Sequence, residues 1–100
     1  MGILNSLFGK GPNIKEALEK GGQIVDVRSQ GEFQGGNTPN SLNIPLNNLE
    51  SKLSQFENMQ KPIILCCASG NRSGQAERFL KSKNIDCLNG GSWTNVNNQL

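Results

Sequence analysis

The sequence predicts an α/β domain with a central, mainly parallel sheet flanked by helices. Short segments rich in β-branched residues alternate along the chain with segments whose apolar residues recur at helical spacing. The segment of residues 63–67 (Ile-Ile-Leu-Cys-Cys) is apolar at every position, which is typical of a strand covered on both faces in a parallel sheet. The chain has 100 residues, enough for one compact domain, and we expect residues 1–100 to form a single domain.

The N-terminal part is predicted to contain a helix, a strand and a long loop. Asn13 and Glu16 have the spacing of a capping box, and with the Gly-Gly pair that follows they predict a helix over residues 13–20. Residues 23–28 are rich in β-branched side chains and predict a strand. Residues 29–40 hold three glycines and a proline, so we expect a loop that contains one helical turn.

The middle of the chain adds a short extended piece and a second helix. Residues 42–45 are predicted to form the extended piece. One helical face is predicted for Leu46, Leu49, Leu53 and Phe56. Asn47 and Glu50 again have capping-box spacing, which predicts a helix start at this point.

The C-terminal part continues the alternation after the apolar strand. A polar turn, residues 68–73, leads into a predicted helix with Ala76, Phe79 and Leu80 on one face. Residues 85–88 predict a last short strand, and the Gly90-Gly91 pair predicts a sharp turn after it. A terminal helix is predicted to pack through Trp93, Val96 and Leu100.

Composition and charge exclude several classes of protein. The formal charge is +2, and Lys and Arg are scattered, which argues against a nucleic-acid platform. No stretch approaches the roughly 20 apolar residues of a membrane span, and the N-terminus lacks the basic start of a secretory signal. Gly2 and Ser6 fit the pattern for N-myristoylation. The alternative interpretation is an apolar patch that covers an edge of the domain, formed by Ile3, Leu4, Leu7 and Phe8.

The cysteine and histidine counts limit the chemistry. There are three cysteines, an odd number, which is not a disulfide framework, so we expect a reducing cytosol and a cytoplasmic protein. There is no histidine, which excludes a Cys-His nucleophile pair and any His-ligated metal site. Any reactive cysteine must therefore be activated by other groups.

The turn after the apolar strand is the predicted site of chemistry. Ligands of parallel sheets bind at the carboxyl ends of strands, where a tight loop and the following helix direct backbone N–H groups inward. Cys67, the last residue of the strand, would project its sulfur into this bowl, and the thiol pKa of such a cysteine is lowered by one to several units. Gly70 permits a positive φ angle, and Arg72 adds a cation able to bind an oxyanion. The alternative is that Cys67 is only a small buried apolar residue.

Four segments in order resemble the rhodanese family. Residues 67–73 (Cys-Ala-Ser-Gly-Asn-Arg-Ser) resemble its Cys-x-x-Gly-x-Arg-Ser loop, including the six-residue length. Residues 26–33 are similar to the family's Asp-Val-Arg segment with a following Glu-Phe, residues 43–46 to its Asn-Ile-Pro turn, and residues 88–91 to its Leu-x-Gly-Gly signature. The resemblance covers residues 13–100. The chain departs from the family's Gly-His-Ile-Pro-Gly-Ala segment, where it has Gly-Asn-Thr-Pro-Asn-Ser at residues 36–41.

The resemblance implies a three-layer rhodanese-like domain and a sulfurtransferase of the thiosulfate:cyanide type. Cys67 would be the nucleophile and would carry sulfane sulfur as a persulfide from a small-molecule donor to a thiol or cyanide acceptor, or to a sulfur-accepting protein. The substrate-binding residues implied by the loop are Ala68, Ser69, Gly70, Asn71, Arg72 and Ser73. Some efficient thiosulfate users place basic residues where this chain has uncharged Ala68 and Ser69. No metal or organic cofactor is implied.

Two other functions fit the same residues. Counted from Cys66, the segment matches the Cys-x5-Arg-Ser signature of cysteine phosphatases, in which Cys66 would attack phosphorus and Arg72 would bind the phosphate. The third possibility is a non-catalytic rhodanese-fold binding module, although such modules usually lack the cysteine that this chain retains.

The remaining candidate residues are assigned supporting or structural roles. Asp26 and Arg28 would either pair with Glu32 or Arg72 and brace the bowl, or be solvated charges at the end of the strand. Strand alternation directs Cys66 away from Cys67, so we expect Cys66 to lie in the core. Cys87, in a short apolar strand, and Trp93 are also expected to be structural.

Overall fold

The computed structural model describes residues 13–100 and confirms the α/β architecture. Four strands form one sheet in the order β2-β1-β3-β4, and every neighbouring pair is parallel. The strands are β1 (Ile24–Asp26), β2 (Leu42–Asn43), β3 (Ile63–Cys67) and β4 (Cys87–Ser92). The helices are α2 (Ile14–Glu19), α3 (Gln30–Gln34), α4 (Leu53–Glu57), α5 (Asn71–Ser82) and α6 (Trp93–Asn97), with two 3-10 turns, η1 (Leu46–Asn48) and η2 (Glu50–Lys52).

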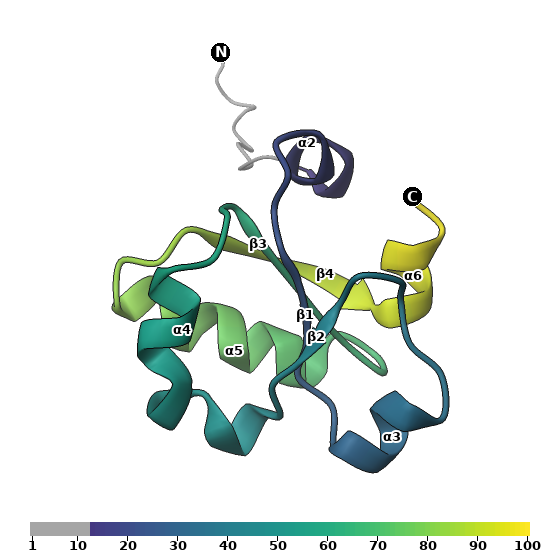
Figure 1. Ribbon diagram of the computed structural model, residues 1–100, viewed down its shortest axis with the longest axis horizontal. Helices are drawn as coiled ribbons and strands as arrows, with labels where there is room; N and C mark the ends of the chain where they lie inside the picture. The colour runs from purple at the N-terminus through teal and green to yellow at the C-terminus, as the bar shows by residue number, and fades with distance from the viewer. Residues whose placement is uncertain (1–12) are drawn as a thin grey trace.

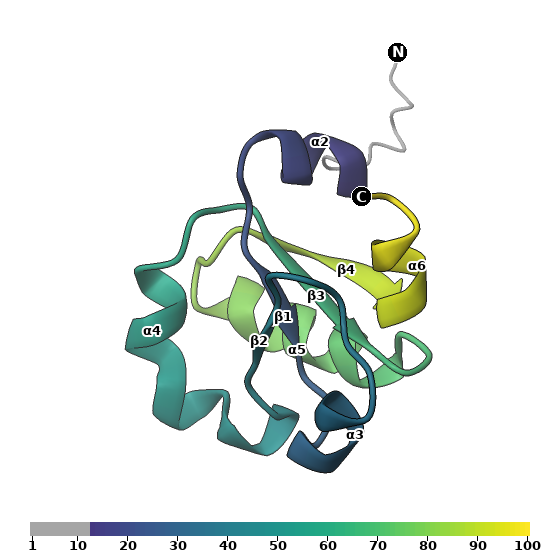
Figure 2. The ribbon, with the colours of Figure 1, turned by 45° about the vertical axis from the view of Figure 1, so that its right-hand side comes forward.

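Helices cover both faces of the sheet, so the domain has three layers. Figure 1 shows α4 and α5 on one side of the sheet and α2 and α6 on the other, and the turned view in Figure 2 agrees. The central strand β3 contributes side chains to both faces, as the period of two requires. Ile63, Leu65 and Cys67 pack in the cluster under α5, whereas Ile64 and Cys66 pack with Ala17 of α2 and Val96 of α6.

Several expected elements are confirmed at the level of individual contacts. The capping box at the start of α2 forms, because the Glu16 amide donates to Asn13 Oδ1 at 2.9 Å and the Asn13 amide donates to Glu16 Oε1 at 3.1 Å. The helical turn expected within residues 29–40 is α3, and it has its own capping box between Ser29 and Glu32.

The predicted helix near residues 46–56 has the right apolar face but the wrong start. Leu49 and Phe56 are buried, yet the segment consists of η1, η2 and α4, and no side chain caps any of the three. The expected capping box at Asn47 does not form because this residue already lies inside η1, which begins directly after Pro45.

The C-terminal predictions need three corrections. Helix α5 begins at Asn71, so the last part of the predicted turn is its first turn. Strand β4 runs through the predicted Gly90-Gly91 turn, because Gly91, with a φ of +82°, permits a bulge where the pairing with β3 shifts register. Helix α6 ends at Asn97, and Leu100 is 62% exposed instead of packed.

The N-myristoylation pattern and the apolar patch predicted for residues 3–8 lie outside the described residues. Among the helices of residues 13–100, none combines the length and the apolar character that crossing a bilayer requires.

Candidate active site

The sulfur of Cys67 lies in a cradle of backbone amides at the carboxyl end of β3. It accepts hydrogen bonds from the Gly70 amide at 3.0 Å and from the Ser73 amide at 3.4 Å, and the Ser73 hydroxyl lies 3.4 Å away. The residue is completely buried and belongs to the apolar cluster under α5. Cys67 is therefore a core residue whose sulfur is held by polar groups.

The cradle closes because Gly70 adopts a left-handed conformation with a φ of +96° just before α5. A Cβ atom at this position would also lie 3.3 Å from Gly91 Cα, so the loop approaches β4 more closely than a side chain would comfortably allow. Glycine is the residue that meets both conditions. The turn brings the amides of the loop and of the first turn of α5 to one side of the sulfur.

The cradle changes the acidity of the Cys67 thiol. Burial acts to raise its pKa, because it penalises the charged form. Hydrogen bonds from the Ser73 hydroxyl and amide, and from two further loop amides, outweigh burial and lower the pKa of Cys67 to about 7. Burial raises the pKa of Cys66 to about 12 and that of Cys87 to about 11, so these two thiols stay protonated.

The other predicted loop residues line the rim of the cradle. Ala68, Ser69 and Asn71 are exposed, whereas Ser73 is buried beside the sulfur. A hollow of about 160 Å³ opens next to this rim. It is lined by Val27, Ser29, Pro45, Leu46, Asn47 and Arg72. Among the described residues of the loop, Arg72 is the one that lines this hollow.

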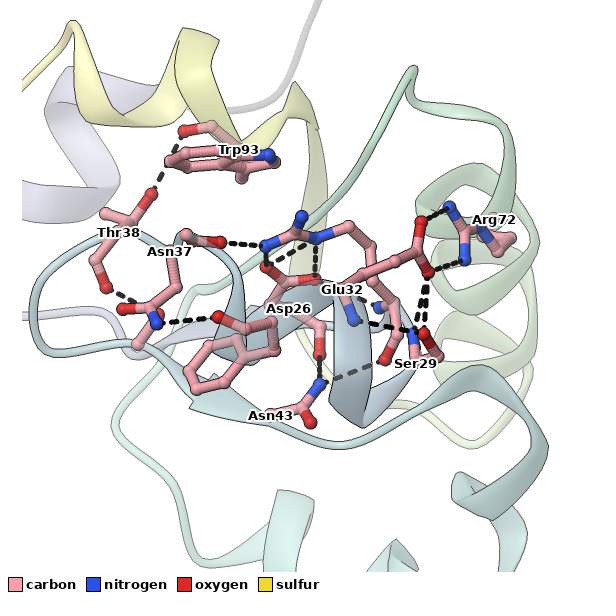
Figure 3. A network of polar contacts seen from close by, with 12 residues as sticks. Asp26, Ser29, Glu32, Asn37, Thr38, Asn43, Arg72 and Trp93 are labelled. Atoms are coloured by element: carbon pink, nitrogen blue, oxygen red, sulfur yellow. Dashed lines mark hydrogen bonds and ion pairs between the residues drawn. The ribbon is translucent and has the colours of Figure 1, made fainter.

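Arg72 forms an ion pair with Glu32 of α3. The guanidinium donates to Glu32 Oε1 at 2.7 Å and to Oε2 at 3.1 Å, and both side chains are partly exposed. Glu32 also accepts from the amide and hydroxyl of Ser29, each at 3.0 Å. Hydrogen bonds from Arg72 and then from Ser29 lower the pKa of Glu32 to about 2. Figure 3 shows Glu32 between Ser29 and Arg72, where it joins α3 to the loop that follows Cys67.

Asp26 and Arg28 do not pair with Glu32 or Arg72, and they are not solvated; both expectations are wrong. They pair with each other in the interior, where Arg28 Nη2 lies 2.7 Å from Asp26 Oδ2 and Nε lies 3.0 Å from both carboxylate oxygens. Arg28 also donates to the Gly36 carbonyl, and its guanidinium lies 4.9 Å from the centre of the Trp93 ring. Val27 is still hydrogen-bonded to the backbone of Cys66 and Leu46, and directly after it the Arg28 side chain turns back onto the carboxylate.

Asn89 is the site residue that the sequence analysis missed. Its Oδ1 accepts from the Ser73 hydroxyl at 2.7 Å and from the Gly91 amide at 2.9 Å, and its Nδ2 donates to the Gly70 carbonyl at 3.0 Å. The only sequence signal was its place before the Gly-Gly pair of β4, and that place does not specify a contact with a loop 16 residues away.

Comparison with known proteins gives a consistent family match. A family model described as "Rhodanese-like domain" matches residues 12–96. The Drosophila melanogaster protein named rhodanese domain-containing protein CG4456 is 39% identical over 85 residues, which cover 70% of this chain and 77% of that protein. A protein of Pseudomonas savastanoi named thiosulfate sulfurtransferase GlpE is 30% identical over 70 residues, covering 69% of this chain and 65% of that protein.

Solved structures show the same similarity. A rhodanese-like domain protein from Staphylococcus aureus superposes with a TM-score of 0.67 at 29% identity, covering 93% of this chain and 81% of that one. The chain spans 46% of the length of the Bacillus subtilis protein YqhL, to which it is 37% identical over 59 residues, or 59% of this chain.

Proposed function

The chain belongs to the rhodanese-like domain family, and on that premise we propose that it transfers sulfane sulfur through a persulfide on Cys67. The observation that carries the proposal is the Cys67 sulfur itself, which accepts hydrogen bonds from the Gly70 and Ser73 amides at the end of the central strand. Amide dipoles directed at a sulfur favour the thiolate, which is the nucleophilic form. The relative named thiosulfate sulfurtransferase supports the same class of reaction.

The proposed cycle has two displacements. In the first, the Cys67 thiolate attacks the outer sulfur of thiosulfate; a new S–S bond forms, the donor's S–S bond breaks, and sulfite leaves with that electron pair. In the second, cyanide or a thiolate attacks the outer sulfur of the persulfide, and Cys67 leaves as a thiolate. The products are thiocyanate or a new persulfide. Atoms, electrons and charge balance in both steps without an oxidant or a reductant.

The loop residues have distinct roles in this proposal. The backbone of residues 68–73 stabilises the negative charge, first on the thiolate and then on the persulfide. Arg72 stands beside the hollow of about 160 Å³ and would attract an anionic donor when it leaves Glu32. The acceptor in the cell would be a small thiol, cyanide or a sulfur-accepting protein. A reducing compartment such as the cytoplasm would keep Cys67 free to react.

The test of the proposal is persulfide formation on the reduced full chain. After incubation with thiosulfate, intact mass should increase by one sulfur atom, and peptide mapping should locate it on Cys67. Addition of cyanide should remove that mass and release thiocyanate. Cys67→Ser should abolish both signals, whereas Cys66→Ala is the matched control and should keep them.

The Cys66→Ala control also distinguishes sulfur transfer through Cys67 from the phosphatase alternative. The Cys66 side chain packs among apolar residues on the face opposite the loop, so nothing in the geometry favours it as a nucleophile. Loss of activity in Cys66→Ala alone would contradict sulfur transfer through Cys67. Absence of both mass gain and thiocyanate from the wild-type chain would instead support a binding module.

A further inference from the structure

The Ser73 hydroxyl lies between Cys67 Sγ and Asn89 Oδ1 but has only one proton to donate. Its oxygen is 3.4 Å from Cys67 Sγ and 2.7 Å from Asn89 Oδ1. Ser73 is completely buried, so water does not compete for this proton. The direction of the hydroxyl therefore couples the sulfur to the amide of Asn89.

The orientation of the Asn89 amide is fixed by its other contacts. Nδ2 donates to the Gly70 carbonyl at 3.0 Å, and Oδ1 accepts from the Gly91 amide at 2.9 Å. If the two ends of the Asn89 amide were exchanged, its NH2 group would face the Gly91 N–H and its oxygen would face the Gly70 carbonyl. Both hydrogen bonds would then be lost. Oδ1 therefore faces Ser73 as an acceptor, and the Ser73 hydroxyl is the donor.

The direction of this proton has to differ between the two states of Cys67. When Cys67 is a thiol, its S–H donates to Ser73 Oγ, the Ser73 hydroxyl donates to Asn89, and every group has a partner. When Cys67 is a thiolate, it has no proton to donate and attracts the Ser73 hydroxyl, which must turn away from Asn89. Of its two donors within residues 13–100, Asn89 Oδ1 then keeps the Gly91 amide. Ionisation of the sulfur thus breaks one hydrogen bond to Asn89.

We propose that Asn89 is a positioning residue for sulfur transfer, which accepts the Ser73 hydroxyl proton while the Cys67 sulfur is uncharged and releases it when that sulfur becomes a thiolate. The inference rests on the proposed function and deepens it. In the persulfide, the Cys67 sulfur is uncharged, because the negative charge sits on the outer sulfur, so the hydroxyl donates to Asn89. When the acceptor removes the outer sulfur, the electron pair returns to Cys67 and the hydroxyl turns back. The Ser73 O–H bond stays intact throughout.

The charged side chains near the sulfur are paired with each other, so neutral hydrogen bonds decide the ionisation state of Cys67. Arg72 on α5 is paired with Glu32 on α3, and Arg28 is paired with Asp26 at the end of β1. The neighbouring thiol of β3 is directed to the other face of the sheet. The state of Cys67 is therefore sensitive to the groups in direct contact with it, of which the Ser73 hydroxyl is the one that can change partner.

The test is the pH midpoint of Cys67 alkylation in the full chain, measured in the wild-type and in a Ser73→Ala background. Asn89→Ala removes the competing acceptor, and Asn89→Asp replaces it with a stronger one. For each substitution, the midpoint shift in the Ser73→Ala background is subtracted from the shift in the wild-type background. After this subtraction, we expect Asn89→Ala to lower the midpoint and Asn89→Asp to raise it. Each difference should be about half to one pKa unit, the size of one net hydrogen bond.

The comparison of backgrounds separates the relay from a structural effect. A looser loop or an added charge would shift the Cys67 midpoint by the same amount in the wild-type and Ser73→Ala backgrounds. Equal shifts in the two backgrounds therefore overturn the proposal. Asn89 is exposed, so its replacement leaves the core intact, and Asn97→Ala, which removes another exposed amide, is the matched control and should leave the midpoint unchanged. If Ser73→Ala fails to fold, a higher midpoint for Asn89→Ala in the wild-type background overturns the proposal.

Alkylation needs no sulfur donor, so the two proposals fail separately. If the chain never gains a sulfur atom but the Asn89 shifts depend on Ser73, sulfur transfer is contradicted and the proposed role of Asn89 is supported. A chain that forms the persulfide with equal shifts in both backgrounds would contradict only the relay.

Discussion

The three thiols should differ by orders of magnitude in reactivity, because the fold sets each of their pKa values differently. The pKa is lowered to about 7 for Cys67 and raised to about 12 for Cys66 and about 11 for Cys87. At neutral pH, roughly half of Cys67 is then thiolate, against about one molecule in 10⁵ for Cys66 and about one in 10⁴ for Cys87. Only thiolate reacts at a useful rate with an alkylating reagent.

The assay is a pulse of iodoacetamide on the reduced chain at steps from about pH 5 to about pH 10, which span the range of protein thiols. Cys66 and Cys67 are adjacent, so fragmentation of the modified peptide and the Cys66→Ala variant are needed to tell them apart. We expect the rate at Cys67 to rise through a midpoint near the pKa of about 7 and then level off. The sulfur is fully covered, so its plateau lies below that of a free thiol, and the midpoint is the informative quantity.

Two results would refute this reasoning. A Cys67 midpoint at about 8.5, the value of an unperturbed thiol, would mean that the amides do not outweigh burial. Modification of Cys66 before Cys67 would mean that the assignment of the nucleophile is wrong. Ser73→Ala gives an internal check: removal of a donor to the thiolate should move the Cys67 midpoint upward, whereas an unchanged midpoint would leave the amides as its sole stabilisers.

Three further predictions concern the ion pairs and the loop. Asp26→Asn leaves the buried Arg28 guanidinium without its counter-charge and should reduce the free energy of unfolding by about 3 kcal/mol or more in urea titrations; a loss below about 1 kcal/mol, the value of an exposed pair, would contradict the buried pairing. Glu32→Gln should free Arg72 and lower the KM for thiosulfate several-fold in steady-state assays, with kcat little changed; a KM that stays the same or rises would contradict a role of Arg72 in donor capture. Gly70→Ala should destabilise the fold by about 1–2 kcal/mol, because alanine disfavours a left-handed φ, and should slow persulfide formation as followed by mass; wild-type values for both would show that the cradle tolerates a side chain here.

The sequence was sufficient to predict the architecture and the position of the loop that follows Cys67. An uninterrupted apolar strand followed by a glycine-containing turn is a local pattern, and in the structure it becomes β3 and the loop around Cys67. Strand alternation also predicted the opposite directions of Cys66 and Cys67, since the period of two holds for any strand regardless of its neighbours.

Two features that the sequence did not predict depend on contacts between distant segments. The Gly90-Gly91 pair indicates a turn locally, but a Cβ at Gly90 would lie 2.7 Å from Val96 Cγ2 and 3.1 Å from the Leu65 carbonyl. These glycines are therefore required by close packing and a bulge inside β4. Likewise, the partner of Arg72 lies 40 residues earlier in the chain, at Glu32, and sequence spacing alone does not show which acidic group α3 brings to the loop.

On the proposed function, the arrangement of charges assigns sulfur activation and donor capture to two different parts of the site. Arg28 and Arg72 have carboxylate partners, and the groups in direct polar contact with the Cys67 sulfur are amides and one hydroxyl. Such contacts are screened little by salt, whereas the attraction of an anionic donor to an exposed arginine is screened strongly. Opening the Glu32–Arg72 pair would affect donor attraction but not the sulfur. It would expose a cation at the hollow without removing any group that holds the sulfur. On the proposed function, donor capture and sulfur activation would therefore vary independently, and substitutions in α3 would alter the first while leaving the second intact.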